Sequence, residues 1–599
     1  MARKTRKKVP NDPAPAFSPP PRPADTAPNP LDLDATALMA AYRTGLYRPS
    51  QVIGRCITLI DHANPRLNFL VEDRFEAALA EAQASDERWK RGEPAGELDG
   101  VPITVKESFD VAGMKTTGGL AHRRDHVADA DAGAVALLRA AGAIVLGKTN
   151  TPALCFCQET DNALYGRTNN PWDPRLTTGG SSGGEAVAVS IGASAFGLGS
   201  DIGGSIRIPS TFCGVVGYKP GPAAFPYDGH FPAPELTQTV QSRMLAYGPL
   251  TRSVRDARRI AKILKTGSGQ VPDAPDSSEP ARDRIGRVLV VGSFSRTRLH
   301  PDVDRVLQQA AGALEGISGS VTGQVPPFLS ETPMAWQRIM SLDGARDIAK
   351  LAYPSRFPRL AGHPLRAAVD YARSLAGLAT EQHPYLSWSL IGAFLFAPSP
   401  REWRDTEAHL EGGFAWLHEH LRDGGVILSP AYPEPAQAHG EVYKGIFSLK
   451  LTFQQLLPYI TLANVFGLPA LVLPCGFTED GEAAGVSSPK RTGNSTLENR
   501  KSDGEAAGVS SPNRTGNSTL ENRKSDGEAA GVSSPNRTGN STLENRKSDG
   551  EAAVEAARVP IGLQLTTLPG QEWALFAAGE RLEKALGRTL RNHFWDPGR

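Results

Sequence analysis

The chain has few cysteines, no long apolar segment and almost no net charge. Five cysteines among 599 residues are too few for a disulfide-rich scaffold, and they favour a reducing compartment, so we expect a cytoplasmic protein. No run of 18 apolar residues occurs, and we therefore expect no transmembrane helix. A net charge of +1 offers no general attraction to nucleic acid, and we expect none to bind.

Motifs for metals and nucleotide cofactors are missing as well. Cys155 and Cys157 lack a second pair of ligands, so we interpret them as core or pocket lining. A phosphate-binding loop needs Gly-Lys-Ser/Thr, but the chain has Gly204-Ser205-Ile206. A dinucleotide fingerprint fails because Ile202 occupies its third glycine position. We expect neither a metal nor a cofactor.

Glycine next to serine is what the chain does contain. Two clusters, Gly179–Gly184 and Gly203–Ser205, flank a small-residue segment, Ala186–Gly199, which we predict to be a helix. Glycine at this density costs entropy and is tolerated where the backbone must approach a ligand closely. Such clusters are often flexible loops, but apolar residues surround these two. Their serines are therefore candidate nucleophiles.

The two clusters and an upstream lysine resemble the signature of the amidase signature family. That signature reads GGSSGG, here Gly179–Gly184, and later G-S-D-x-G-G-S-x-R-x-P, here Gly199–Pro209. The family's catalytic lysine ends a V-P-x-x-V-K segment, which Val101–Lys106 matches. Within the family, Lys106-Glu107 and Tyr165–Pro171 resemble the corresponding segments of fatty-acid amide hydrolase-like members, especially the second type.

The resemblance implies an α/β fold with a large mixed, twisted β-sheet covered by helices on both faces. It also implies a triad in which Ser205 is the nucleophile, Ser181 relays a proton after a cis peptide bond, and Lys106 is the base. Lys106 must be neutral, so burial must bring its pKa below the usual value of about 10.4. The resemblance further implies an oxyanion hole formed by the backbone N–H groups of Ile202, Gly203, Gly204 and Ser205. It also implies three supporting side chains, which are Ser200, Asp201 and Arg207. We expect the aspartate to pair with the arginine and Ser200 to bond the relay serine.

The reaction implied is hydrolysis of a small-molecule amide through an acyl-enzyme, giving a carboxylate and an amine or ammonia. N-acyl amides with an apolar acyl group are the expected substrates, and a homodimer is left open. One alternative is an amidotransferase-type subunit, which would use the same triad to release ammonia for a partner. The other is an α/β-hydrolase-type esterase with Ser181 as nucleophile, because Gly179–Gly183 also matches Gly-x-Ser-x-Gly.

We predict one amidase domain in two parts, residues 31–479 and 554–599. A basic, proline-rich tail, residues 1–30, precedes it and is expected to be disordered. Residues 480–553 repeat DGEAAGVSSPKRTGNSTLENRKS with a period of 23 and contain too few apolar side chains to pack as a solenoid. We expect a disordered insertion, dispensable for catalysis, in a turn between two strands.

Hydrophobic spacing predicts the other elements. A helix is expected at 254–264, and mainly helical stretches at 31–91 and 301–421. Short apolar runs predict strands at 101–105, 143–146, 288–291, 426–430, 471–477 and 559–565.

Overall fold

The computed structural model describes residues 28–233, 239–265, 284–342, 345–355, 362–448, 450–479 and 558–586. All of these belong to one compact unit, Met1–Val486 with Ala556–Arg599. The predicted tail, up to residue 27, and the whole repeat insertion lie outside the described residues.

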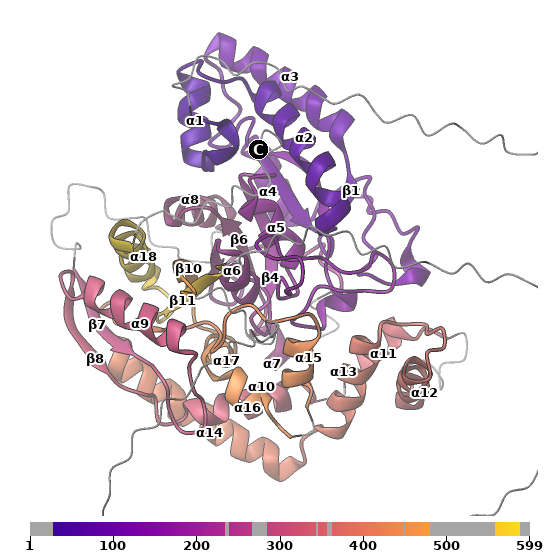
Figure 1. Cartoon of the computed structure of the whole chain (residues 1–599), viewed down its shortest axis with the longest axis vertical. Coiled ribbons are helices and arrows are strands. Elements are labelled where there is room, and N and C mark those ends of the chain that lie inside the picture. The colour runs from indigo at the N-terminus through magenta and orange to yellow at the C-terminus, as the bar shows by residue number, and fades with distance from the viewer. Residues whose placement is uncertain are drawn as a thin grey trace, which may run out of the picture. The chain divides into compact units, whose positions relative to one another are not determined.

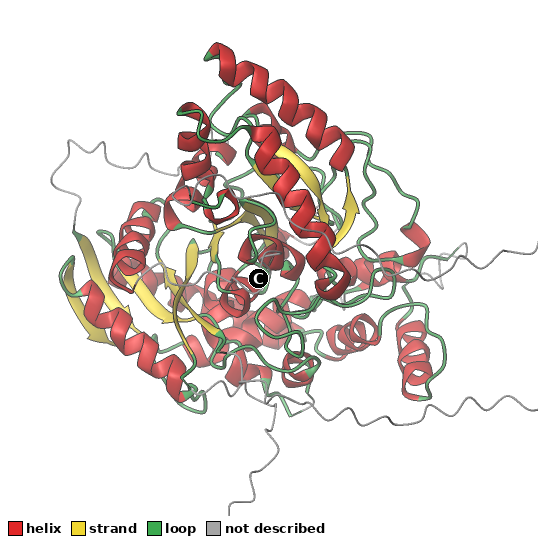
Figure 2. Cartoon of the chain, turned by 45° about the horizontal axis from the view of Figure 1, so that its top comes forward, coloured by secondary structure: helices red, strands yellow, loops and turns green. Residues whose placement is uncertain are grey.

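One mixed sheet of eleven strands runs through this unit, and it lies between layers of helices (Figure 2). Strands β2, β3 and β4 are parallel neighbours, as are β7, β8 and β9, while the other pairs are antiparallel. In spatial order the strands are β1 (Leu70–Asp73), β3 (Ile144–Thr149), β2 (Pro102–Lys106), β4 (Phe196–Asp201), β6 (Ala246–Thr251), β5 (Val216–Lys219), β10 (Ala470–Phe477), β11 (Pro560–Thr566), β9 (Val426–Pro430), β7 (Ile285–Val290) and β8 (Ser318–Gly323).

Helices cover both faces of the sheet, which confirms the predicted fold class. Successive strand residues alternate between two cores: Leu471 and Leu473 pack with helices α8, α9 and α18, while Ala470 and Val472 pack with α10 and α17. The helices are α1 (Ala35–Arg43), α2 (Pro49–Leu67), α3 (Phe75–Arg91), α4 (Gly133–Ala140), α5 (Gly183–Ser190), α6 (Arg207–Cys213), α7 (Thr239–Ser242), α8 (Val254–Leu264), α9 (Pro301–Leu314), α10 (Thr332–Met340), α11 (Arg346–Ala352), α12 (Pro364–Leu375), α13 (Pro384–Leu395), α14 (Pro400–Leu421), α15 (Glu441–Ile446), α16 (Phe453–Leu456), α17 (Pro458–Val465) and α18 (Glu572–Leu586).

Most of the predicted elements are present. Helix α8 and strand β9 have the expected bounds, and β10 pairs antiparallel with β11 in the register Leu471↔Leu565. That pairing is the one expected for two strands on either side of the repeat insertion.

Three sequence-based expectations are wrong. The segment 186–199 is not one helix, because α5 ends at Ser190 and β4 begins at Phe196. Strand β1 interrupts the helical stretch 31–91, and β8 interrupts 301–421. All three strands exist through pairing with distant strands, which local spacing does not reveal.

A third, smaller apolar cluster lies apart from the two cores of the sheet. Helices α11, α12 and α13 group together at the lower right of Figure 1 and pack against Leu154. Among the described helices, none combines the length and the apolar character that a membrane crossing requires. All five cysteines are free thiols.

Candidate active site

Two parallel strands bring Lys106 and Ser200 together. Strand β2 ends at Lys106, and its neighbour β4 carries Ser200 near its own carboxyl end. The Lys106 Nζ atom lies 2.9 Å from Ser200 Oγ and 2.6 Å from Ser181 Oγ. Ser181 lies just before helix α5, and the Gly180–Ser181 peptide bond is cis. Lys106 and Ser181 are completely buried.

Burial lowers the pKa of Lys106, and the acidic groups around it only partly oppose this effect: Cys155, Asp201 and Glu185. The nearby Glu185 is itself buried, and this raises the pKa of its carboxyl group to about 8. Its oxygens are held by the hydroxyls of Thr104 and Thr149, at 2.6 and 2.7 Å. A carboxyl with that pKa is mostly protonated at neutral pH, so it gives the lysine little counter-charge.

His230 orients the hydroxyl of Ser200. The carbonyl of Pro232 lies 3.1 Å from His230 Nδ1 and can only accept, so Nδ1 carries the proton. The other nitrogen, Nε2, then presents a lone pair to Ser200 Oγ at 3.1 Å and Ser108 Oγ at 3.0 Å. We expected Ser200 to bond the relay serine, but it lies against Lys106 and His230. The sequence analysis missed His230 because a single histidine in an irregular loop carries no motif.

A cavity opens beside these polar groups. Its volume, including the part open to solvent, is about 640 Å³, and its lining includes Ser181, Ser200, Ser205 and His230. A second cavity of about 460 Å³ also contains Ser205, but not Ser181. The two cavities share five lining residues and are therefore two arms of one site. The relay arm is the cavity that contains Ser181, and the glutamine arm is the cavity that contains Gln158 and Gln337. The shared residues are Cys155, Phe156, Ile202, Ser205 and Met340.

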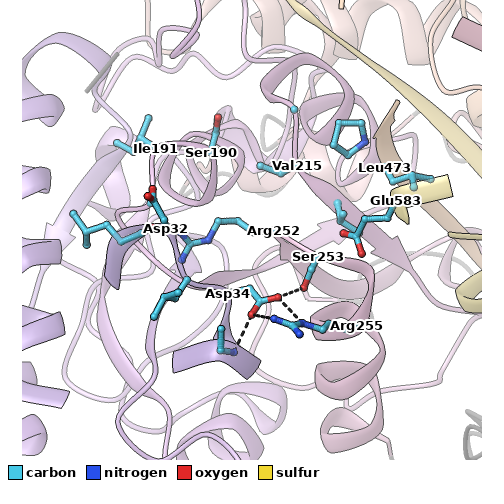
Figure 3. A pocket seen from close by; sticks show the side chains of 17 residues that line it. Asp32, Asp34, Ser190, Ile191, Val215, Arg252, Ser253, Arg255, Leu473 and Glu583 are labelled. Atoms are coloured by element: carbon cyan, nitrogen blue, oxygen red, sulfur yellow. Dashed lines mark hydrogen bonds and ion pairs between the residues drawn. The ribbon is translucent and has the colours of Figure 1, made fainter. Parts of the chain in front are cut away.

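Another cavity, of about 1010 Å³, lies elsewhere in the unit (Figure 3). Its lining includes Asp34, which accepts bonds from Arg255 and Ser253. None of the site residues expected from the sequence lines it.

The loop after β4 presents backbone N–H groups close to Ser205. The N–H groups of Ile202, Gly203 and Ser205 have no hydrogen-bond partner among the described residues. The N–H of Gly204 differs, because it donates to Asp201 Oδ1 at 2.9 Å. Because one N–H cannot donate fully to two acceptors, Gly204 is not available as an oxyanion donor, although we expected it to be one. Trp336 fixes this loop: its Nε1 donates to the Ile202 carbonyl at 2.8 Å, and a Cβ on Gly203 would lie 2.6 Å from its ring.

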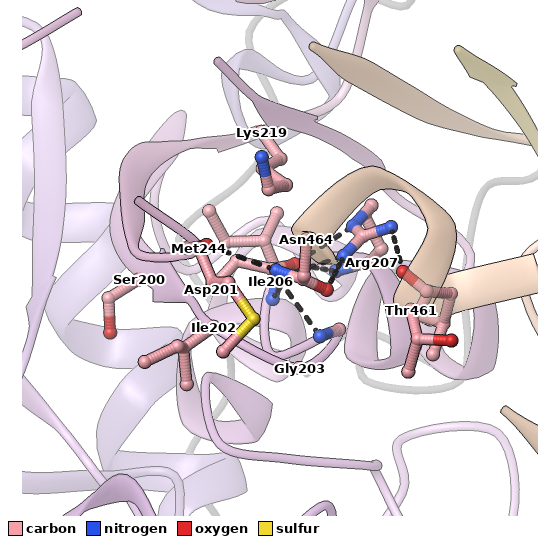
Figure 4. A network of polar contacts seen from close by, with 12 residues as sticks. Ser200, Asp201, Ile202, Gly203, Ile206, Arg207, Lys219, Met244, Thr461 and Asn464 are labelled. Atoms are coloured by element: carbon pink, nitrogen blue, oxygen red, sulfur yellow. Dashed lines mark hydrogen bonds and ion pairs between the residues drawn. The ribbon is translucent and has the colours of Figure 1, made fainter. Parts of the chain in front are cut away.

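Asp201 and Arg207 form a sealed ion pair behind the loop (Figure 4). Their closest atoms are 3.0 Å apart, and both side chains are fully buried. The guanidinium also donates to the Ile460 carbonyl at 2.8 Å, to Gln564 at 2.7 Å and to Asn464 at 2.6 Å. Burial alone would raise the pKa of Asp201, but Arg207, together with Lys219 and Asn464, outweighs burial and lowers this pKa below the usual range.

Within the described ranges, no group of three or more His, Cys, Asp or Glu side chains is arranged to hold a metal ion. Cys155 and Cys157 both line the site, as expected, and neither belongs to a ligand cluster.

Comparisons with known proteins agree with this geometry. The family model described as Amidase matches residues 51–576. Fatty-acid amide hydrolase 2 of Homo sapiens is 32% identical over 451 residues, covering 73% of this chain and 81% of that protein. One subunit of the glutamyl-tRNA(Gln) amidotransferase of Endomicrobium trichonymphae is 26% identical over 457 residues, covering 74% and 90%. A solved fatty acid amide hydrolase has a similar fold, with a TM-score of 0.67 at 21% identity over 93% of this chain and 86% of the other.

Proposed function

The chain belongs to the amidase signature family and is an amide-hydrolysing enzyme, and on this premise we propose that Ser205, Ser181 and Lys106 form its catalytic triad. One observation carries the proposal: a buried lysine amine lies 2.6 Å from Ser181 Oγ at the edge of a cavity that also contains Ser205. The lowered pKa of Lys106 supports a neutral amine, which can act as a base.

The network around Lys106 gives its lone pair a direction. The Ser200 hydroxyl donates to His230, so its oxygen accepts a proton of the Lys106 amine. The lone pair of that amine is then left to accept the Ser181 proton. Ser181 in turn accepts the proton of Ser205 as the nucleophile attacks.

The reaction proceeds in two steps: the first forms an ester on Ser205, and the second hydrolyses it. Ser205 Oγ bonds to the amide carbon, and the oxyanion is held by N–H groups of Ile202, Gly203 and Ser205, each worth about 2.7–4 kcal/mol. Ser181 returns its proton to the leaving nitrogen as the C–N bond breaks, which leaves an acyl ester on Ser205. Lys106 then returns the proton it holds to Ser181. Water attacks the ester while Ser181 and Lys106 take its proton, and the bond between Ser205 Oγ and the acyl carbon breaks. The proton returns through Ser181 to Ser205 Oγ, and the acid that leaves ionises to the carboxylate.

The walls of the site support apolar groups on the substrate. The relay arm is lined by Leu154, Phe156, Leu245, Met340 and Ile348. The glutamine arm adds the apolar side chains of Trp336, Ala393 and Phe447. We therefore propose amides with an apolar substituent, and an acyl chain that is apolar over most of its length. The five free thiols support a cytoplasmic location.

The test measures covalent labelling and amine release by the purified chain. A fluorophosphonate should label Ser205, Ser205→Ala should abolish both labelling and aniline release, and Ser181→Ala should weaken both. Ser182→Ala is the matched control, because Ser182 belongs to the same cluster but lines neither arm. Labelling of Ser181 alone would favour the esterase alternative, and turnover that requires a second protein would favour the amidotransferase alternative.

A further inference from the structure

Gln158 carries a buried acceptor that the proposed triad does not use. Only 6% of this residue is exposed, and its Oε1 atom has no hydrogen-bond partner among the described residues. The other end of the amide lies near the Gly203 carbonyl, with Nε2 donating to it over 3.5 Å. Because a carbonyl can only accept, this contact fixes which way the amide is turned.

The wall of the glutamine arm supplies no donor for this atom. Gln337 donates through Nε2 to Ser341 Oγ at 2.9 Å, and Ser389 donates to the Tyr385 carbonyl at 2.7 Å. Most of the other side chains that line the arm are apolar, including Trp336, Met340 and Phe447. The polar ones, Ser205, Cys155 and Cys157, make no hydrogen bond to Gln158 Oε1 in the described part of the chain. Buried polar atoms in native proteins almost always have partners, so an acceptor without one, on a residue that lines a cavity, points to a ligand that donates.

The proposed reaction decides which part of the substrate enters this arm. The leaving nitrogen must take its proton from Ser181, which lines only the relay arm. The acyl substituent therefore extends from the carbonyl at Ser205 into the glutamine arm. Gln158 lies beside Gly203, so the donor it meets belongs near the carbonyl end of the acyl chain.

We propose that Gln158 Oε1 accepts a hydrogen bond from a hydroxyl or N–H group on the acyl part of the substrate. The preferred substrates are amides of mostly apolar acids that carry one such donor. This inference rests on the proposed function and narrows its substrate class. A plain hydrocarbon chain would leave this buried acceptor without a hydrogen bond, while a chain with a donor supplies one.

The test uses the 4-nitroanilides of hexanoic acid and of its 2-, 3- and 4-hydroxy derivatives. At least one hydroxy anilide should exceed the hexanoyl anilide in kcat/KM by about tenfold, the usual worth of an unpaired buried group. It should also bind the Ser205→Ala variant about tenfold more tightly in calorimetry, since this preference is one of binding.

Three variants separate the acceptor from the fold. Gln158→Met should bring the hydroxy-to-plain ratio to about one, while Gln158→Glu, which keeps an acceptor, should retain a preference. Gln337→Met is the matched control and should keep the wild-type ratio, because it removes a glutamine of the same arm that already has a partner.

Two results would overturn the inference: no preference for any hydroxy anilide in either measurement, or a preference that survives Gln158→Met. Release of nitroaniline from none of the four substrates would count against the proposed function instead. The dissociation constants of Ser205→Ala would still decide the role of Gln158 in that case.

Discussion

Ser200 and Asp201 are neighbours on β4, yet they belong to opposite kinds of polar network. Ser200 faces Lys106 and His230 beside the cavity, where hydroxyls and an amine of lowered pKa share protons. Asp201 faces Arg207 on the other side of the strand, away from Ser200 (Figure 4). A strand that alternates its faces can thus keep mobile protons and fixed charges one residue apart.

The charged and the proton-sharing groups of this region are thus kept in separate networks. The charged network has its acceptors and donors matched across α6, α17 and β11, so it holds the loop in place. The network at the cavity keeps its amine at a lowered pKa, so it can accept a proton. The following predictions test this division, beginning with the largest expected effect.

Replacing Lys106 by Met should cause the largest loss. The variant keeps the apolar stem but removes the proposed base, so kcat for anilide hydrolysis should fall about 10²–10⁴-fold. Lys219→Met is the matched control, since Lys219 is also a fully buried lysine, and its hydrogen bonds within the described residues go to the carbonyls of Pro220 and Leu468. Equal losses in kcat for the two variants would contradict the assignment of the base.

Replacing Arg207 by Met should cost the fold more than the chemistry. It leaves the Asp201 carboxylate buried without its partner, so the free energy of unfolding should fall by about 3–5 kcal/mol in urea denaturation. The double variant Asp201→Asn/Arg207→Met should recover part of this loss, because no unpaired charge remains. A double variant as unstable as the single one would show that packing, and not charge, explains the effect.

The two networks should titrate in different pH ranges. Lys106 must be neutral to act, so kcat/KM should fall about tenfold per pH unit as the pH drops below its lowered pKa. The folded pKa of Asp201 is lowered, so its contribution to stability is complete above the unfolded value of about 3.9 and is lost only as the pH falls through the folded value. Activity profiles and chemical denaturation between pH 9 and 5 should therefore show activity falling while this contribution stays constant.

Ser200→Ala should have a moderate effect. It removes the hydroxyl between Lys106 and His230, so kcat should fall about fivefold, in line with the net worth of one hydrogen bond. Ser108→Ala provides the comparison, because the Ser108 hydroxyl also contacts His230, whereas the Lys106 amine bonds Ser181 and Ser200. A larger loss in kcat for Ser108→Ala would contradict the proposed orientation of the lysine.

Glu185→Gln should change activity least. The pKa of Glu185 is raised to about 8, so an uncharged amide of the same shape replaces a carboxyl that is already mostly protonated at pH 7. We expect kcat within about twofold of wild type at pH 7, since the hydrogen-bond partners remain. Glu185→Ala, which empties a fully buried position, should instead lower the melting temperature clearly.

The sequence predicted the elements and residues that local patterns define. The fold class, β2 ending at Lys106, and the pairing of β10 with β11 follow from apolar runs and from the family signature. The end of α5 at Ser190 could not be predicted, because β4 is defined by its pairing with β2 and β6.

In the site, too, residues within motifs could be predicted, but contacts between distant parts of the chain could not. Gly204 was expected among the oxyanion donors, and only the folded loop reveals that Asp201 already holds its N–H. His230 and Gln158 stand outside the recognised motifs, and their roles depend on atoms brought together from distant parts of the chain. Motifs therefore indicate the groups that react, while the groups that orient them need coordinates.

Because Arg207 contacts Gln564, the loop that carries Ser205 cannot be fully anchored until β11 has been synthesised. These residues are 357 positions apart, and Gln564 belongs to β11, which lies between β10 and β9 in the sheet. At a synthesis rate of about 5–20 residues per second, a nascent chain waits about 20–70 s after Arg207 before Gln564 is made. Until then the loop that carries Ser205 lacks one of its anchors and two neighbouring strands lack their partner. The layout of the sheet thus delays completion of the site until β11 has been made, so that chains ending before β11 are expected to be inactive as well as unstable.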